Sequence, residues 1–215
     1  MIKGLIFDLD GVIISTVRYH YSAWKKIADE LNLKFSLADN ELLKGVSRTR
    51  SFEIILDLNN VRMTPDEIQK WCDKKNGYYQ EFISEITKDD LLPGVYEFIT
   101  DAKRQNYKIA LGSASRNSRQ ILKLSNIENL FDAIVDGNMV SSAKPDPEVF
   151  LKSAELLGLN PGECLVFEDS AAGIMAARNG EMSAVGVGNY EVKELADYFI
   201  PEFNNIELTT ILKKI

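Results

Sequence analysis

Cysteine and histidine are scarce in this chain of 215 residues, which contains two cysteines and one histidine. Cys72 and Cys164 are too few and too far apart to form a disulfide framework or a zinc site. We therefore expect two free thiols, as in proteins of the reducing cytosol. A fold held together by disulfides or by structural zinc is excluded.

Long apolar runs and an excess of positive charge are also missing. No apolar stretch approaches the ~18 residues that a membrane-spanning helix requires, and Met1-Ile2-Lys3 leads directly into the first expected strand. The formal net charge of −7 argues against non-specific binding to nucleic acid or to an anionic membrane, although a local group of cations can still hold a phosphorylated ligand. We expect a soluble, cytoplasmic monomer with no nucleic-acid or membrane partner.

Apolar residues make up 45% of the chain, which supports a sizeable buried core. In the second half, short apolar runs typical of strands buried on both faces alternate with helical patterns. The expected strands end at Leu111-Gly112, 133–135, 165–167 and 184–187, and the expected helices cover 117–124, 147–157 and 171–178. This alternation predicts an α/β fold, a Rossmann-like doubly wound parallel sheet with helices on both faces.

Residues 16–87 interrupt the alternation. Helical patterns fill this block without an evident strand, at 18–31, 48–58 and 64–86. Thr64 is expected to cap the third helix, with Pro65 in its first turn. We predict that 16–87 form a helical cap domain inserted after the first strand of a catalytic core domain, which comprises 1–15 and 88–215. Both connections between the domains are expected to act as hinges.

Two pairs of acids follow expected strands: Asp8 and Asp10 after the first apolar run, and Glu168 and Asp169 after a later one. Because the downstream tips of parallel strands meet at one edge of a sheet, we expect these acids to converge. Buried carboxylates need a compensating cation, and oxygen ligands without a nearby histidine or thiolate favour Mg²⁺. The alternative for the second pair is ordinary capping of a helix that begins near Ser170.

Two further segments are suited to phosphate. Residues 111–117 pass from a strand tip into a helix, where hydroxyls and backbone amides can surround an anion, and Ser113 is the first expected contact. Lys144 precedes another expected helix, which has Pro147 in its first turn, and can neutralise charge between phosphate and carboxylate. Taken singly, the first segment also fits an ordinary serine-rich turn, and Lys144 fits a solvated surface lysine.

In their order and spacing, these motifs resemble those of the haloacid dehalogenase superfamily of phosphoryl-transfer enzymes. The matching residues, within a resemblance that extends over the whole chain, are Asp8-Leu9-Asp10-Gly11, Ser113, Lys144-Pro145 and Glu168-Asp169. The resemblance implies that Asp8 attacks a phosphoryl group and becomes an aspartyl phosphate, while Mg²⁺ offsets the repulsion between carboxylate and phosphate. It implies that Asp10 acts as general acid and base. The implied magnesium ligands are Asp8, Asp10 through its backbone carbonyl, Glu168 and Asp169.

The helical block is similar to that of the β-phosphoglucomutases within this superfamily. The similarity implies a second phosphate site, in which an arginine of the block offers its bidentate fork to phosphate oxygens. The implied substrate-binding residues are Thr16, His20, Trp24, Lys44, Gly45, Val46, Ser47, Arg48, Lys75, Asn76, Ser113, Ala114, Ser115, Arg116, Asn117 and Lys144. Arg116 stands where the mutases usually have lysine, which keeps the charge and alters the donor geometry.

The resemblance thus implies interconversion of β-D-glucose 1-phosphate and glucose 6-phosphate through β-glucose 1,6-bisphosphate, with small sugar phosphates as partners. Two alternatives stay open, a magnesium-dependent sugar-phosphate phosphatase of the same superfamily and a non-catalytic sugar-phosphate binder. Single residues also have simpler interpretations. His20 can serve a local hydrogen bond, Trp24 can belong to the core of the cap, and Lys44, Arg48 and Lys75 can be solvated charges.

Overall fold

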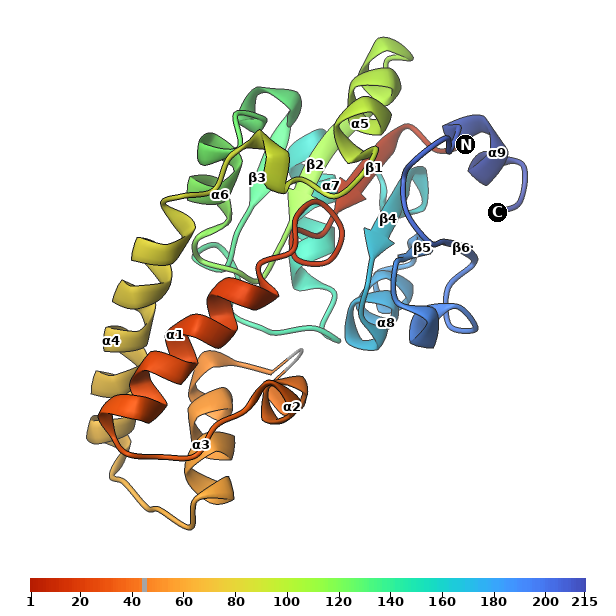
Figure 1. Cartoon of the computed structure of the whole chain (residues 1–215). Helices are drawn as coiled ribbons and strands as arrows, with labels where there is room; N and C mark the ends of the chain where they lie inside the picture. The colour runs from red at the N-terminus through yellow and green to blue at the C-terminus, as the bar shows by residue number, and fades with distance from the viewer. Residues whose placement is uncertain (44–45) are drawn as a thin grey trace. The chain divides into compact units, whose positions relative to one another are not determined.

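The computed structural model describes residues 1–43 and 46–215, which fall into two compact units (Figure 1). The core unit consists of Met1–Ser15 and Ile86–Ile215, and the helical unit consists of Thr16–Glu85. None of the described helices combines the length and the apolar composition that a membrane crossing requires.

The core unit is built on a parallel sheet, whose described strands number six and follow the order β3-β2-β1-β4-β5-β6 (Figure 1). The strands are β1 Gly4–Phe7, β2 Lys108–Gly112, β3 Ala133–Val135, β4 Cys164–Glu168, β5 Ser183–Val187 and β6 Tyr198–Ile200. The predicted parallel α/β sheet is confirmed. The strand order reverses between β1 and β4, and ligands of open α/β sheets bind at such a switch point, beyond the carboxyl ends of the strands.

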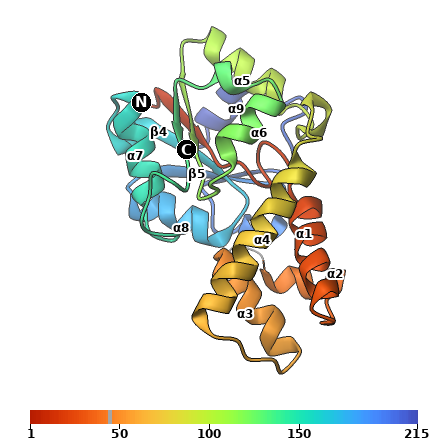
Figure 2. The same ribbon diagram turned by 90° about the vertical axis from the view of Figure 1, so that its left-hand side faces the viewer.

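Helices cover both faces of this sheet, with α7 and α8 on one side and α5 and α9 on the other (Figure 2). In the core unit they are α5 Val95–Arg104, α6 Ser118–Leu124, α7 Glu148–Leu157, α8 Ala171–Asn179 and α9 Leu208–Leu212, with 3-10 turns at Lys88–Asp90, Glu128–Leu130, Pro161–Glu163 and Tyr190–Val192. Ile6 and Val166 point to the cluster formed with α7 and α8. On the opposite face, Phe7 and Phe167 stack with ring centroids 4.6 Å apart and meet Phe98 of α5. Apolar packing on both faces fixes the strand register, and therefore where each strand ends.

The starts of two helices in the core unit differ from the prediction. α7 begins at Glu148, and Pro147 is its N-cap residue instead of lying in the first turn. The Pro147 carbonyl already accepts from the Phe150 N–H at 3.0 Å, so the proline is half inside the helix. α6 likewise begins at Ser118, with Asn117 as its N-cap residue. A sequence pattern places such boundaries only to within one or two residues.

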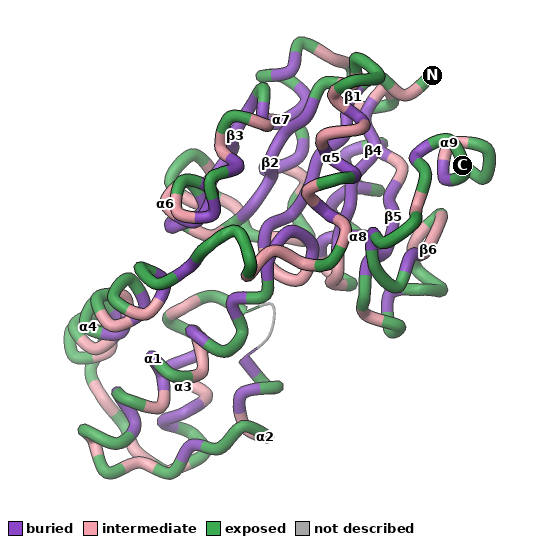
Figure 3. The backbone as a smooth tube through the Cα atoms, turned by 45° about the horizontal axis from the view of Figure 1, so that its top comes forward, coloured by how far each residue is buried: buried purple, intermediate pink, exposed green. Residues whose placement is uncertain are grey.

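The helical unit contains α1 Val17–Glu30, α2 Leu37–Asn40, α3 Arg48–Leu58 and α4 Pro65–Ile83, with a 3-10 turn at Glu41–Leu43. No strand occurs among its described residues. Thr64 caps α4, and Pro65 occupies the first position of that helix, as predicted. Trp24 and Phe52 stack with centroids 5.7 Å apart inside a buried cluster, and such buried positions are purple in Figure 3. The four residues of α2 are too few for a helical pattern, so the sequence did not predict this helix.

The segment that leaves the core after β1 pairs with the segment that returns to it. The Leu92 N–H donates to the Ile13 carbonyl at 2.9 Å, and Ile14 forms a bridge with Leu91. The turn that follows β1 is closed by a backbone hydrogen bond, in which the Gly11 N–H donates to the Ile14 carbonyl at 2.9 Å. Backbone hydrogen bonds thus hold the residues that directly follow β1.

Candidate active site

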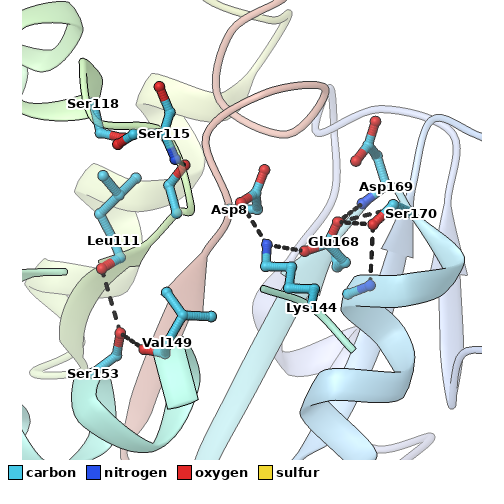
Figure 4. Close-up of polar contacts among 12 residues, drawn as sticks. Asp8, Leu111, Ser115, Ser118, Lys144, Val149, Ser153, Glu168, Asp169 and Ser170 are labelled. Carbon is cyan, nitrogen blue, oxygen red and sulfur yellow. Dashed lines mark hydrogen bonds and ion pairs between the residues drawn. The ribbon is translucent and has the colours of Figure 1, made fainter. Parts of the chain in front are cut away.

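Two of the predicted acids, far apart in the sequence, lie at the ends of neighbouring strands. Asp8 directly follows β1, Glu168 is the last residue of β4, and the two strands pair in register through Phe7 and Phe167. The Asp8 N–H donates to the Phe167 carbonyl at 3.0 Å. Both acids are buried, with relative exposures of 7% and 1%. The carboxyl edge of the sheet therefore brings these acids together (Figure 4).

Lys144 bridges the two carboxylates. Its Nζ donates to Asp8 Oδ1 and to Glu168 Oε2, each at 2.7 Å (Figure 4). The Lys144 side chain is 12% exposed, and its ammonium lies 4.8 Å from the centre of the Phe150 ring. Burial opposes the charge of this ammonium, but the two carboxylates outweigh burial and raise the Lys144 pKa. Lys144 is therefore a largely buried cation held by acids, and the interpretation as a solvated lysine is wrong.

Asp169 joins Asp8 and Glu168 in an acid cluster, in which one carboxylate oxygen of each residue lies within 4.8 Å of the others. Burial, and then the neighbouring acids, raise the pKa of Asp8 to about 7 and that of Asp169 to about 8, against the opposing effect of Lys144. One ammonium thus does not offset two buried acids and a third that is partly buried. A hard divalent cation that prefers carboxylate oxygens would supply the missing charge, so the donor set fits Mg²⁺.

Gly11 lets Asp169 approach the turn after β1. The glycine has a φ of +77°, and a Cβ built on it would lie 2.0 Å from Asp169 Oδ2. A side chain at this position would push Asp169 away, so the close approach requires glycine. Asp10, one residue earlier, is partly exposed and is not a member of the acid cluster found among the described residues. Its backbone contact with a metal ion stays a prediction.

Glu168 also organises the start of α8. Its Oε1 accepts from the Asp169 N–H at 3.1 Å, the Ser170 N–H at 3.0 Å and the Ser170 hydroxyl at 2.8 Å. Ser170 is the N-cap residue, and its Oγ accepts from the Gly173 N–H at 3.1 Å. The capping role that the sequence left open is present. It uses one oxygen of Glu168 and leaves the other for Lys144.

The Ser113 loop, residues 113–117, follows β2, the strand next to β1. Ser113 is 2% exposed, and its Oγ accepts from the Ser115 N–H at 3.2 Å. The Ser115 Oγ accepts from the Asn117 N–H at 3.4 Å. These bonds fold the loop around its own hydroxyls, as in an ordinary serine-rich turn. The exposed residues of the loop are Ala114 and Arg116.

In the helical unit, His20, Trp24 and Lys75 lie together. Lys75 Nζ is 2.8 Å from His20 Nδ1, 5.1 Å from the centre of the Trp24 ring and 4.6 Å from that of Tyr79. Lys75 is 2% exposed, so its interpretation as a solvated charge is wrong. Burial, Lys75 and Arg48 disfavour a second positive charge and lower the His20 pKa well below its usual value. A neutral His20 ring can accept a hydrogen bond from Lys75 at Nδ1.

The other predicted residues of the helical unit differ in their exposure and contacts. Arg48 is partly exposed, and its Nη2 donates to Asn76 Oδ1 at 2.9 Å. Ser47 is the N-cap residue of α3, and Val46 before it is 40% exposed. Thr16 precedes α1 and is 1% exposed. Two predicted residues lie outside the described part of the chain, namely Lys44 and Gly45.

Two residues that the sequence did not mark as functional form hydrogen bonds to the backbone near the acid cluster. Asn189 Nδ2 donates to the Asp169 carbonyl at 3.1 Å. Glu148 Oε2 accepts from the Ser142 N–H at 2.7 Å, which ties down the segment that leads to Lys144. Asn189 lies just beyond β5, so its place at a strand tip was a usable signal. Glu148 had no signal beyond the usual preference for acids in the first turn of a helix.

Comparisons with known proteins cover nearly the whole chain. A sequence model of haloacid dehalogenase-like hydrolases matches residues 2–180. The β-phosphoglucomutase of Bacillus subtilis strain 168 is 41% identical over 208 residues, which are 96% of this chain and 92% of that protein. The fructose-1-phosphate phosphatase of Escherichia coli K12 is 30% identical over 184 residues, 86% of this chain and 95% of that one. The crystal structure of a β-phosphoglucomutase from Clostridium difficile matches with a TM-score of 0.91 and 41% identity, covering 100% of this chain and 97% of that one.

Proposed function

Since the chain belongs to the haloacid dehalogenase-like hydrolase family, we propose that it is a magnesium-dependent β-phosphoglucomutase. It interconverts β-D-glucose 1-phosphate and glucose 6-phosphate through β-glucose 1,6-bisphosphate. The superfamily resemblance of the motifs is confirmed by the family match. The observation that carries the proposal is the buried bridge of Lys144 between Asp8 and Glu168, in a chain similar to mutases over both of its units.

Asp8 is the nucleophile of this proposal. Its carboxylate forms a bond to phosphorus while the bond from phosphorus to the sugar oxygen breaks, which leaves an aspartyl phosphate. Lys144, 2.7 Å from Asp8, offsets the charges of carboxylate and incoming phosphate. When bound by the acid cluster, Mg²⁺ supplies further positive charge and Lewis acidity toward phosphate oxygens.

Asp10 is the general acid and base of the proposal. It gives a proton to the departing sugar oxygen and later removes one from the sugar hydroxyl that attacks the aspartyl phosphate. The residue lies in the turn after β1 and outside the acid cluster of the described residues. Asp8 and Asp10 can therefore serve different roles although they lie two residues apart, because only Asp8 belongs to the acid cluster.

A mutase must also bind the phosphate that is not reacting. We assign this task to Ser115, Arg116 and Asn117 of the Ser113 loop, together with Arg48 of the helical unit. Arginine can bind phosphate oxygens through two parallel hydrogen bonds. In the proposal the helical unit acts as a cap, which excludes water while the aspartyl phosphate exists and so favours transfer to sugar over hydrolysis.

The protein acts as a monomer in the cytoplasm, on small sugar phosphates. Cys72 and Cys164 are both buried free thiols, as expected of the reducing cytosol. Burial raises the pKa of each thiol to about 11, which keeps it in the unreactive protonated form.

The test is an assay with Mg²⁺, β-D-glucose 1-phosphate and a catalytic amount of the bisphosphate, in which glucose 6-phosphate and inorganic phosphate are measured together. We expect many turnovers to glucose 6-phosphate with little phosphate release, and much slower conversion of the α anomer. Stoichiometric phosphate release would favour the phosphatase, which the similarity to the fructose-1-phosphate phosphatase keeps as a second candidate. Binding without turnover would favour the non-catalytic binder.

A further inference from the structure

The Ser113 loop is flanked by a second turn, residues 136–138, which directly follows β3. Asp136 is 8% exposed, and its Oδ1 accepts from the Asn138 N–H at 2.8 Å. The Asp136 carbonyl accepts from the Met139 N–H at 2.9 Å. This 136–138 turn is therefore held by its own hydrogen bonds and can act as a fixed support.

Two hydrogen bonds join the 136–138 turn to the Ser113 loop. The Gly137 N–H donates to the Ser115 carbonyl at 3.1 Å, and Asn138 Nδ2 donates to the Arg116 carbonyl at 3.2 Å. The Ser115 carbonyl also accepts from Ser118 Oγ at 2.7 Å, and these two serines lie together in Figure 4. Two successive carbonyls of the loop are thus anchored, which fixes the peptide planes on either side of Arg116.

Gly137 also sets how closely the turn and the loop approach. A Cβ built on Gly137 would lie 2.1 Å from the Ala114 carbonyl oxygen and 3.1 Å from Arg116 Cγ. A larger residue must therefore displace the loop backbone. A Cβ on Gly162, by contrast, would meet nothing within 4 Å, so this glycine is a matched control.

We propose that Gly137 and Asn138 are positioning residues that set the affinity of the site for the phosphate that is not reacting. They act through the carbonyls of Ser115 and Arg116, and thereby favour a sugar bisphosphate over a phosphate monoester without a second phosphate. This inference rests on the proposed function. A displacement of about 1 Å in such a loop is enough to lower a rate by about 100-fold, because the bound geometry is lost.

The experiment compares Asn138→Ala and Gly137→Ala with the controls Asn204→Ala and Gly162→Ala. Asn204 is an exposed asparagine whose amide donates to nearby Glu202 at 3.3 Å. For each variant we measure kcat and KM for β-glucose 1,6-bisphosphate in the mutase reaction, kcat/KM for hydrolysis of p-nitrophenyl phosphate, and the Tm.

We expect Asn138→Ala to raise the KM for the bisphosphate about fivefold, the effect of one lost hydrogen bond. Gly137→Ala is expected to raise it about tenfold or more. In both variants kcat/KM for p-nitrophenyl phosphate falls much less, and the controls behave as the unmodified protein. If Gly137→Ala fails to fold, Asn138→Ala still decides the matter, because this exposed side chain loses a single bond to the loop.

Either of two results would overturn the inference. The first is an unchanged KM for the bisphosphate in Asn138→Ala. The second is an equal loss of kcat/KM with both substrates, which would indicate a merely structural role. Failure of the proposed function is separate from either result. It would be seen in the unmodified protein, as an absence of glucose 6-phosphate formation.

Discussion

Lys144 donates a hydrogen bond to Asp8 Oδ1 at 2.7 Å across a sequence separation of 136 residues. The same ammonium donates to Glu168 at 2.7 Å, so one largely buried cation is shared by two buried carboxylates. Asp169 adds a third acid to the cluster. Removing one partner from such a group leaves uncompensated charge in a poorly solvated place, which is far more destabilising than losing a surface ion pair.

We expect Lys144→Met to lower the free energy of unfolding by about 3 kcal/mol at about pH 8.5 without metal ion, because the acids lose their counter-charge. Addition of Mg²⁺ should recover part of this loss. The kcat/KM should fall at least about 100-fold, as on removal of one donor that stabilises developing charge. Denaturant unfolding and the mutase assay measure both effects, with the exposed Lys214→Met as control. A metal-free stability equal to that of the control would contradict the argument.

The acid cluster could be predicted because it follows from local patterns. Apolar runs that end in acids place Asp8 and Glu168 at strand tips, and parallel pairing brings those tips to one edge of the sheet. The order of the motifs adds Lys144 to the same edge. Helix positions could also be predicted from local patterns. Thr64 followed by Pro65, for example, is a local signal for a helix start.

Contacts between distant side chains could not be predicted in this way. Lys75 has the pattern of a surface lysine, and its burial depends on the rings of Trp24 and Tyr79, which the fold brings to it. Asn138 reaches the carbonyl of Arg116 across 22 residues, and no periodicity marks such a bond. Propensities and periodicity describe neighbours along one element, whereas these contacts arise when separate elements pack.

We expect Asp8→Asn to abolish turnover without unfolding the protein. The variant lacks the nucleophile, so no aspartyl phosphate can form. Because burial and neighbouring acids raise the Asp8 pKa to about 7, its charge is unfavourable in the metal-free protein, and an amide that still accepts from Lys144 should maintain or raise the Tm at about pH 8. Product assays measure turnover, and thermal unfolding measures the Tm. Mass spectrometry of the unmodified protein, trapped during turnover, locates the phosphoryl adduct. Normal turnover, or an adduct on another residue, would show that Asp8 is not the nucleophile.

Magnesium binding is expected to weaken as the pH falls. Raised pKa values of about 7 for Asp8 and about 8 for Asp169 mean that both carboxyls hold protons more tightly in the folded protein than in the unfolded chain. The metal-free protein therefore gains stability as the pH falls from about 8, while Mg²⁺ must displace these protons to bind. The rise in Tm produced by Mg²⁺ should thus be larger at about pH 8.5 than at about pH 6, and Asp169→Asn should reduce this difference. An equal rise at both pH values would refute the expectation.

His20 is the only histidine of the chain, so its titration can be followed without overlap. Burial, and then Lys75 and Arg48, hold its pKa well below 6.5. A histidine with a lowered folded pKa contributes stability above its unfolded value and loses it as the pH falls, because the unfolded chain binds the proton more readily. We expect its NMR ring signals to remain those of the neutral form at about pH 6, and the free energy of unfolding to fall more steeply below about pH 6.5 than in His20→Gln. The carboxylates titrate in both proteins, so the difference in slope isolates His20. A ring titration centred near 6.5, or equal slopes, would mean that His20 is not held neutral by Lys75.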